Sequence, residues 1–141
     1  MAKNSIRHLA LSPLSGFRCK KEVVPEWGGC EVVVREPSSA EWSEFRRLSL
    51  ELLGQQVAEG QTERAGLSEE EQGRAYRYLD AWVISRVVLE PSGQRVFSDD
   101  DVDMLCDRMG PVFTRLVNIS MDLSGMFQAP AQEAHSEAKK D

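Results

Sequence analysis

The sequence has few of the side chains on which most catalysis depends. It contains only two histidines, His8 and His135, and both lie close to an end of the 141-residue chain. A general base works only when a packed shell holds it within hydrogen-bond reach of the proton that it removes, and chain ends rarely provide such a shell. The chain also lacks the motifs of phosphate loops, dinucleotide sites, zinc proteases and nucleophile elbows. The sequence therefore predicts a protein that is not an enzyme and needs no cofactor.

Metal ligands at useful spacing are scarce as well. The three cysteines, Cys19, Cys30 and Cys106, form no C-x-x-C pair, which favours reduced thiols over a metal site. A calcium loop centred on Gly93 would need an acid at its first position, where the chain has Val88. We therefore expect no metal site.

A run of acids at 99–103 invites a catalytic interpretation. Asp99, Asp100 and Asp101 follow Ser98, and acids in the first turn of a helix are stabilised by the positive end of its dipole. We expect this structural role. A carboxylate pair that includes Asp101 or Asp103 is the one enzymatic alternative.

Long apolar runs are also missing. No stretch approaches the roughly 20 apolar residues that a membrane span requires, and the N-terminus lacks the apolar core of a secretory signal. The net charge of −6 and the pI of about 5.0 argue against binding to duplex nucleic acid. We expect a cytoplasmic protein that binds neither membrane nor nucleic acid.

The charge is unevenly distributed along the chain. Residues 1–22 carry five basic side chains against one acid, a net charge of +4, so the remainder carries −10. Such a segment is either a solvated end of the chain or a contact for an acidic partner. The interrupted pattern of residues 1–16 indicates a flexible N-terminal arm.

The first ordered element is predicted to be a β-hairpin. Two β-prone runs, 17–24 and 30–35, flank Pro25 and the pair Gly28-Gly29. Proline places the first strand at an edge or at its end. Alternation puts Val32 and Val34 on one face and Val33 and Arg35 on the other.

Four helices are predicted after the hairpin, at 39–57, 69–89, 99–109 and 111–125. Ser38 with Glu41 and Ser68 with Glu71 form capping boxes before the first two. Apolar residues at helical spacing give the expected core, which consists of Trp42, Phe45, Leu48, Leu79, Trp82, Val83, Leu105, Phe113 and Leu116. The fold class is α+β, mainly α, with a single domain at 17–126 and a disordered tail at 127–141.

Trp27 and the methionines are the candidate binding residues. Trp27, beside the hairpin turn, is either a lid over the core or a contact for a partner. Met104, Met109, Met121 and Met126 gather in the last two helices, where methionine fills core gaps or covers surfaces that hold varied apolar partners. Met121 and Met126, nearest the tail, are the pair expected to be exposed.

Three stretches together resemble the tail assembly chaperones of long-tailed bacteriophages. The first, "VPEWGGCEVVVREPSSAEWSEF", resembles their opening turn, strand and helix through Val24–Gly29, Arg35, Glu36 and Ser38. The second, "SGQRVFSDDDVDML", and the third, "RLVNISMDLSGM", are similar to the middle and closing segments of the family. The resemblance covers about residues 23–126.

The resemblance implies a chaperone that binds the tape measure protein, a very long and largely helical chain, and keeps it soluble in the host cytoplasm during tail assembly. It would be absent from the mature virion. Trp27, Met121 and Met126 would then contact that partner. The alternative is a structural virion protein, such as a tail-completion or connector subunit. The oligomeric state stays open.

The tail "AHSEAKKD" has a further meaning within this family. Members are commonly made in two forms, because some ribosomes slip backward near the end of the short form and add an extension. A run of A bases encoding Ala138-Lys139-Lys140 would permit such slippage. The resemblance therefore implies slippage at Lys139 and Lys140, and a longer form that recruits the major tail protein. An ordinary solubilising tail is the alternative.

Overall fold

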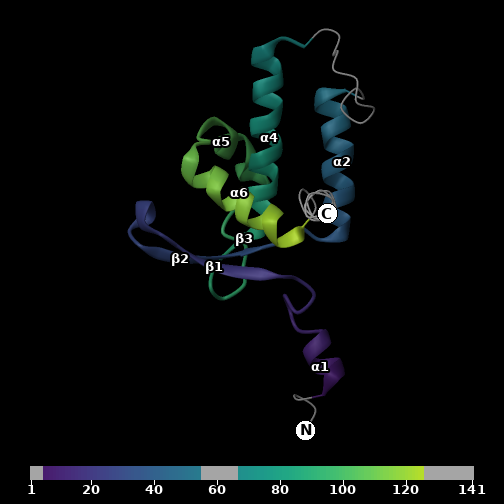
Figure 1. Ribbon diagram of the computed structural model, residues 1–141, viewed down its shortest axis with the longest axis vertical. Helices are drawn as coiled ribbons and strands as arrows, with labels where there is room; N and C mark the ends of the chain where they lie inside the picture. Colours follow the sequence, from purple (N-terminus) through teal and green to yellow (C-terminus); the bar gives the residue numbers. More distant parts are fainter. Residues whose placement is uncertain (1–4, 55–66, 126–141) are drawn as a thin grey trace, which may run out of the picture.

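The computed structural model describes residues 5–54 and 67–125. Two long helices, α2 (Ser39–Leu53) and α4 (Glu69–Val87), stand side by side, and the base of α4 meets a small sheet (Figure 1). Helices α5 (Val102–Asp107) and α6 (Pro111–Ser124) pack against α4, and α6 also contacts the sheet. This arrangement confirms the predicted α+β class with mainly helical content.

The sheet contains the predicted hairpin and one additional strand. Strands β1 (Cys19–Val24) and β2 (Cys30–Arg35) are antiparallel and pair from Cys19 with Arg35 to Val24 with Cys30. The turn begins with the 3₁₀ helix η2 (Pro25–Trp27), because proline cannot continue the ladder. Gly28 and Gly29 follow at φ angles of 74° and 78°, a region that glycine enters without strain.

The third strand, β3 (Val88–Leu89), corrects the predicted end of the central helix. Helix α4 stops at Val87 rather than Leu89, and the next residue already belongs to the sheet. Val88 pairs with Val34, and Leu89 pairs with Val33 and bridges Arg95. Two apolar residues that could extend the helix gain ladder hydrogen bonds instead, and both are buried. The sheet order is β1-β2-β3.

Capping chemistry sets the starts of the helices as predicted. The Ser38 and Ser68 hydroxyls each accept a hydrogen bond from the N–H of the third helical residue, Glu41 or Glu71. In return, the carboxylate of that glutamate accepts a hydrogen bond from the backbone N–H of the serine. Helix α2 ends at Leu53, before Gly54 at a φ of 86°, rather than at residue 57. Residues 55–57 lie outside the described residues.

The helix predicted at 99–109 is shorter and begins with a tighter turn. The 3₁₀ helix η3 (Asp99–Asp101) leads into α5, and the Ser98 N–H donates to the Asp101 carboxylate at 2.8 Å. Helix α6 begins at Pro111, where the missing N–H has no cost, and ends before Gly125 at a φ of 70°.

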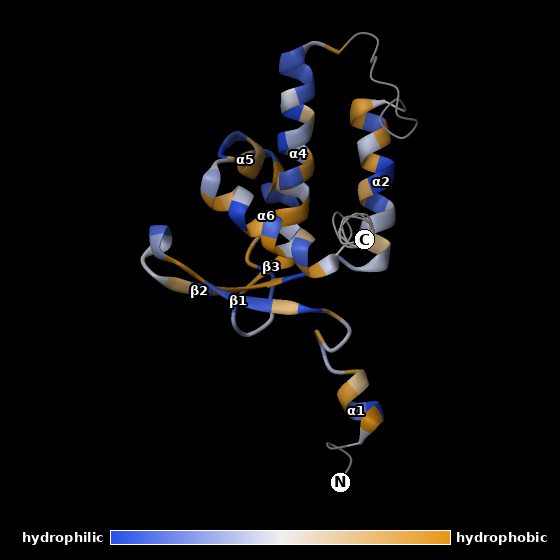
Figure 2. Cartoon of the chain, viewed as in Figure 1, coloured by the Kyte–Doolittle hydropathy of each residue, from blue (hydrophilic) through white to orange (hydrophobic). Residues whose placement is uncertain are grey.

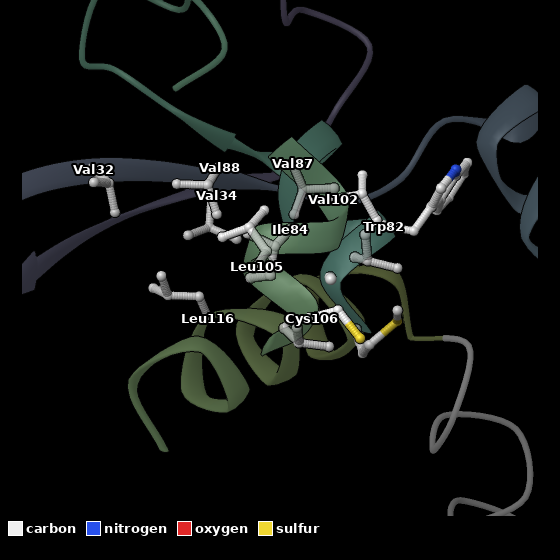
Figure 3. Packing of buried hydrophobic residues seen from close by; sticks show 14 of the residues in the cluster. Val32, Val34, Trp82, Ile84, Val87, Val88, Val102, Leu105, Cys106 and Leu116 are labelled. Atoms are coloured by element: carbon white, nitrogen blue, oxygen red, sulfur yellow. The ribbon is translucent and has the colours of Figure 1, made fainter. Parts of the chain in front are cut away.

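Helix α4 forms the centre of the core (Figure 3). Five predicted core residues are buried: Leu79, Trp82, Val83, Leu105 and Leu116.

The other four, Trp42, Phe45, Leu48 and Phe113, are only half-buried. Three of them lie on α2, which packs mainly on α4 and buries only Leu53 completely. A helix with one main neighbour cannot enclose its whole apolar stripe, and this geometry explains the half-burial of the three residues on α2.

The structure has a short helix in the segment expected to lack regular elements. Helix α1 (Ile6–Ala10) begins after Ser5, whose hydroxyl accepts a hydrogen bond from the His8 N–H at 3.0 Å. It has no buried residue and lies apart from the rest of the molecule (Figure 1). Within the described ranges, no helix is long and apolar enough to cross a membrane.

Trp82 provides a test of this core. The indole is 7% exposed and lies near the ring of Phe45, with centroids 6.3 Å apart. We expect Trp82→Ala to lower the free energy of unfolding by about 3–5 kcal/mol in urea titrations. Tyr76→Ala on the same helix is the matched control, because Tyr76 is 52% exposed, and it should change stability by less than about 0.5 kcal/mol. Equal effects would contradict the assigned orientation of α4.

Candidate functional site

A partly buried ion pair joins the sheet to both long helices. The Arg35 guanidinium, at the end of β2, donates to the two carboxylate oxygens of Glu41 at 2.8 and 2.9 Å. It also donates to the carbonyl of Glu36 at 2.9 Å and to that of Arg86 at 3.0 Å. Arg35 is 9% exposed. The guanidinium thus ties β2 to the start of α2 and to the end of α4.

Arg35 with Glu36, Glu41 and Arg86 is called the Arg35 junction below, and two further contacts involve Arg35. The guanidinium lies over the Phe17 ring, 4.6 Å from its centroid, which is a cation–π geometry. The Ser120 hydroxyl of α6 donates to the Arg35 carbonyl at 2.7 Å. The same Glu41 carboxylate caps α2 by accepting the Ser38 N–H at 2.9 Å. Side chains of the stretch from Arg35 to Glu41 therefore connect strand β2, the turn after it and the start of helix α2.

The electrostatics of the junction favour a charged Glu41. Burial by itself would raise the pKa of this carboxyl. The hydrogen bonds from Arg35 and Ser38, with the positive charges of Arg35 and Arg86, outweigh burial and lower the pKa. Both partners therefore stay ionised, and their charges compensate each other in a partly buried setting.

A second ion pair closes the segment that precedes β1. The Arg18 backbone N–H and side chain both donate to Glu36, at 2.7 to 3.2 Å. Arg18 also reaches the Ser124 carbonyl at the end of α6, at 3.4 Å. Burial would raise the pKa of Glu36, but these hydrogen bonds with Arg18 and its positive charge lower it. The pair holds the start of β1 to the ends of β2 and α6.

Trp27 is placed as a lid over the core. Its ring lies 5.6 Å from that of Phe113 and packs against the buried cluster. Beside it, Arg115 forms ion pairs with Glu26 at 3.2 Å and with Glu22 at 3.5 Å. This geometry agrees with the structural interpretation of Trp27, and a binding role for its outer edge stays a prediction.

The expected exposure of Met121 is wrong. Met121 is 5% exposed and belongs to the main cluster, because it lies on the face of α6 that covers the core. Among the methionines that the structure describes, the exposed one is Met104 of α5, at 54%. Met126, Lys139 and Lys140 lie outside the described residues.

Two acids of the run at 99–103, Asp99 and Asp101, have structural partners. Asp99 contacts Arg95 at 2.7 Å and Arg86 at 3.3 Å, and Asp101 caps η3. The hydrogen bond from Arg95, together with the positive charges of Arg86 and Arg95, lowers the pKa of Asp99. In the part of the chain that the structure describes, no group of three or more histidine, cysteine or acidic side chains could hold a metal ion.

Among the described residues, the most exposed large apolar side chains lie on the N-terminal arm. Ile6, Leu9 and Leu11, called the arm group below, are exposed by 84%, 55% and 67%. Figure 2 shows this apolar segment standing apart from the core. Helix-breaking residues after Leu11 hide this short helix in the sequence, and the one signal for it is Ser5, which caps it before Ile6. Four other large apolar side chains are also exposed, one each on β1, α2, α4 and α5: Val23, Leu50, Tyr76 and Met104.

Comparisons with known proteins point to one family. The sequence profile of a family described as phage tail assembly chaperones matches residues 5–140. This match extends beyond the resemblance at 23–126 on both sides. A solved structure of the tail assembly chaperone of bacteriophage HK97 is 30% identical, with a TM-score of 0.67. The similarity covers 84% of this chain and 95% of that one. No curated protein matches the chain significantly.

The Arg35 junction makes a testable contribution to stability. Glu41→Gln leaves the guanidinium without its counter-charge, and we expect a loss of about 1–3 kcal/mol at neutral pH. Because the folded-state pKa of Glu41 is lowered, its contribution is complete above the ordinary glutamate pKa of about 4.3 and lost as the pH falls through the lowered value. The stability difference between wild type and variant should therefore shrink in acid.

Glu44→Gln is the control for this experiment. Glu44 pairs with Arg47 on the exposed side of α2, where solvent and salt screen the interaction. Its effect should be smaller and should vanish in salt. Urea titrations from pH 7 to pH 2.5 measure both variants. The assigned role of Glu41 is refuted if the two variants behave alike at every pH.

Proposed function

The chain belongs to the phage tail assembly chaperone family, and from this premise we propose that it binds the tape measure protein of its phage and keeps that protein soluble during tail assembly. Family membership carries the proposal, since the match spans residues 5–140 and the HK97 chaperone shares the fold. The chain acts through binding and not through catalysis. It works in the cytoplasm of the bacterial host and leaves before the virion is complete.

The arm group is the binding surface that the structure supports best. Its three side chains are the kind that an apolar helical partner would bury, and contiguous exposed apolar surface often marks an interaction site. The family match begins at residue 5, where Ser5 caps α1, so this helix lies within the matched region. Met121 has no place in this surface, because it is buried in the core.

The longer form belongs to the same proposal. Slippage at Lys139 and Lys140 would join residues 1–140 to an extension that recruits the major tail protein. The domain described here would hold the tape measure protein while the extension brings tail subunits to it. The two lysines fall within the family match, although they lie outside the described residues.

Co-expression with the tape measure protein tests the binding proposal. Wild-type chain should raise the soluble fraction of the tape measure protein several-fold, and Ile6→Ser/Leu9→Ser/Leu11→Ser should remove most of that gain. Because these side chains are exposed, each substitution should change the variant's own stability by less than about 0.5 kcal/mol.

Leu50→Ser/Tyr76→Ser/Met104→Ser is the matched control, because it also removes three exposed apolar side chains. It should leave the soluble fraction near the wild-type value. The chaperone proposal fails if the wild-type chain gives no gain in solubility. The assignment to the arm group fails if the arm-group variant keeps the gain, or if the control variant loses it to the same extent.

The gene sequence tests the longer form. Codons 138–140 should contain the run A-AAA-AAG, as in GCA-AAA-AAG, and an overlapping reading frame should continue downstream. Substitution with synonymous codons that break the run should abolish the longer product in an immunoblot and leave the short form intact. A gene without the run, or without the open overlapping frame, contradicts this prediction.

A further inference from the structure

Strand β1 presents a free edge. Among the described residues, its one neighbouring strand is β2. The Glu36 N–H donates to the Arg18 carbonyl at 3.0 Å, so the backbone of Arg18 faces β2. Along an antiparallel strand, successive residues alternately direct their N–H and C=O groups toward the neighbouring strand and away from it. Lys20, Glu22 and Val24 therefore bond to β2, whereas Cys19, Lys21 and Val23 direct their N–H and C=O groups outward.

The charge of the side chains at this edge determines which kind of added strand could pair with β1. Lys20 forms a long contact of 3.9 Å with Glu22, and no ion pair joins Lys21 to another residue in the described ranges. Lysine at a sheet edge discourages pairing with uncharged or basic strands. Opposite charges on neighbouring strands attract, whereas like charges directly opposite each other repel. In a symmetric antiparallel pairing of two copies centred on Lys21, this lysine would lie opposite Lys21 of the second copy.

The two faces of the sheet have different surroundings beside this edge. Lys21 and Val23 lie on the face that also carries Val33 and Arg35, and Val23 is 54% exposed. On the opposite face, Glu22 of β1 pairs with Arg115 of α6.

Arg115 also lines a shallow depression of about 750 Å³ on α6, whose other lining residues are Gly110, Pro111, Thr114, Asn118, Ile119 and Asp122. The depression therefore borders the free edge on the core side. A strand added at this edge would place every second side chain beside it.

From these observations we propose that β1 receives an extended, acidic segment of a partner protein as a fourth strand. Acidic side chains of the segment lie opposite Lys21 on the outer face, and the alternate apolar side chains lie beside the depression on α6. The outward N–H and C=O groups of Cys19, Lys21 and Val23 supply the hydrogen bonds, as in other cases where a peptide extends a sheet. This site is distinct from the arm group and does not depend on it.

A blocked peptide, Val-Glu-Val-Glu-Val-Glu, tests the site with the full chain. We expect it to slow amide hydrogen exchange at Cys19, Lys21 and Val23 by roughly ten-fold when its concentration is about ten times its dissociation constant. Exchange at Lys20, Glu22 and Val24 should change much less, because these amides are already bonded to β2. The peptide Val-Lys-Val-Lys-Val-Lys should have no effect.

Two substitutions separate backbone pairing from charge. Lys21→Pro removes an outward N–H and no ladder bond, and it should abolish protection while the chain stays folded. Lys21→Glu keeps the backbone donor and should weaken peptide binding by about two- to ten-fold, so it provides the test if the proline variant unfolds. Lys20→Ala is the control and should bind as the wild type does.

Three results would overturn the proposal. The first is unchanged exchange at the outward amides in the presence of the acidic peptide. The second is equal protection by the basic peptide. The third is a dimer in sedimentation experiments whose outward amides are already protected without peptide, since a second copy would then occupy the edge.

Discussion

The arrangement of the domain depends on the ion pair between Arg35 and Glu41. Removing charges from water costs several kcal/mol per ion, and the cost is offset only when the donors and acceptors find well-placed partners. The partners of Arg35 come from the turn after β2, the first turn of α2 and the last turn of α4. The requirement to satisfy one guanidinium therefore fixes three elements relative to one another. Removing either charge would leave the other uncompensated, so the arrangement of the three elements requires both partners.

Much of the fold could be predicted from local chemistry. The hairpin followed from Pro25 and two glycines, and the helix starts followed from Ser38 and Ser68, because such signals act within a few residues of where they stand. Strand β3 could not be predicted in this way. Val88 and Leu89 suit a helix and a strand equally well, and only the presence of Val33 and Val34 across the sheet decides between them. Likewise, the half-burial of Trp42 reflects how many neighbours α2 has, which no periodicity records.

Predictions of the binding surface were less successful than those of the fold, for a physical reason. A methionine in an amphipathic helix is equally compatible with a core and with an exposed surface, and Met121 proved to be buried while Met104 was exposed. The role of Trp27 as a lid became clear only through its contact with Phe113, 86 positions further along the chain. Family resemblance supplied the functional context that composition and spacing did not contain.

The direct passage from α4 to β3, with no residue between Val87 and Val88, limits how the gene can change. A residue inserted into α4 turns everything after it by about 100° around the helix axis, while the same shift in a strand reverses which face each side chain occupies. No loop separates α4 from β3, so neither the rotation of the helix nor the reversal of the strand faces could be compensated locally. A length change here would swap Val88 and Leu89 between the two faces of the sheet and would rotate the carbonyl of Arg86 away from its guanidinium partner. Insertions and deletions that survive selection should therefore be confined to other parts of the gene.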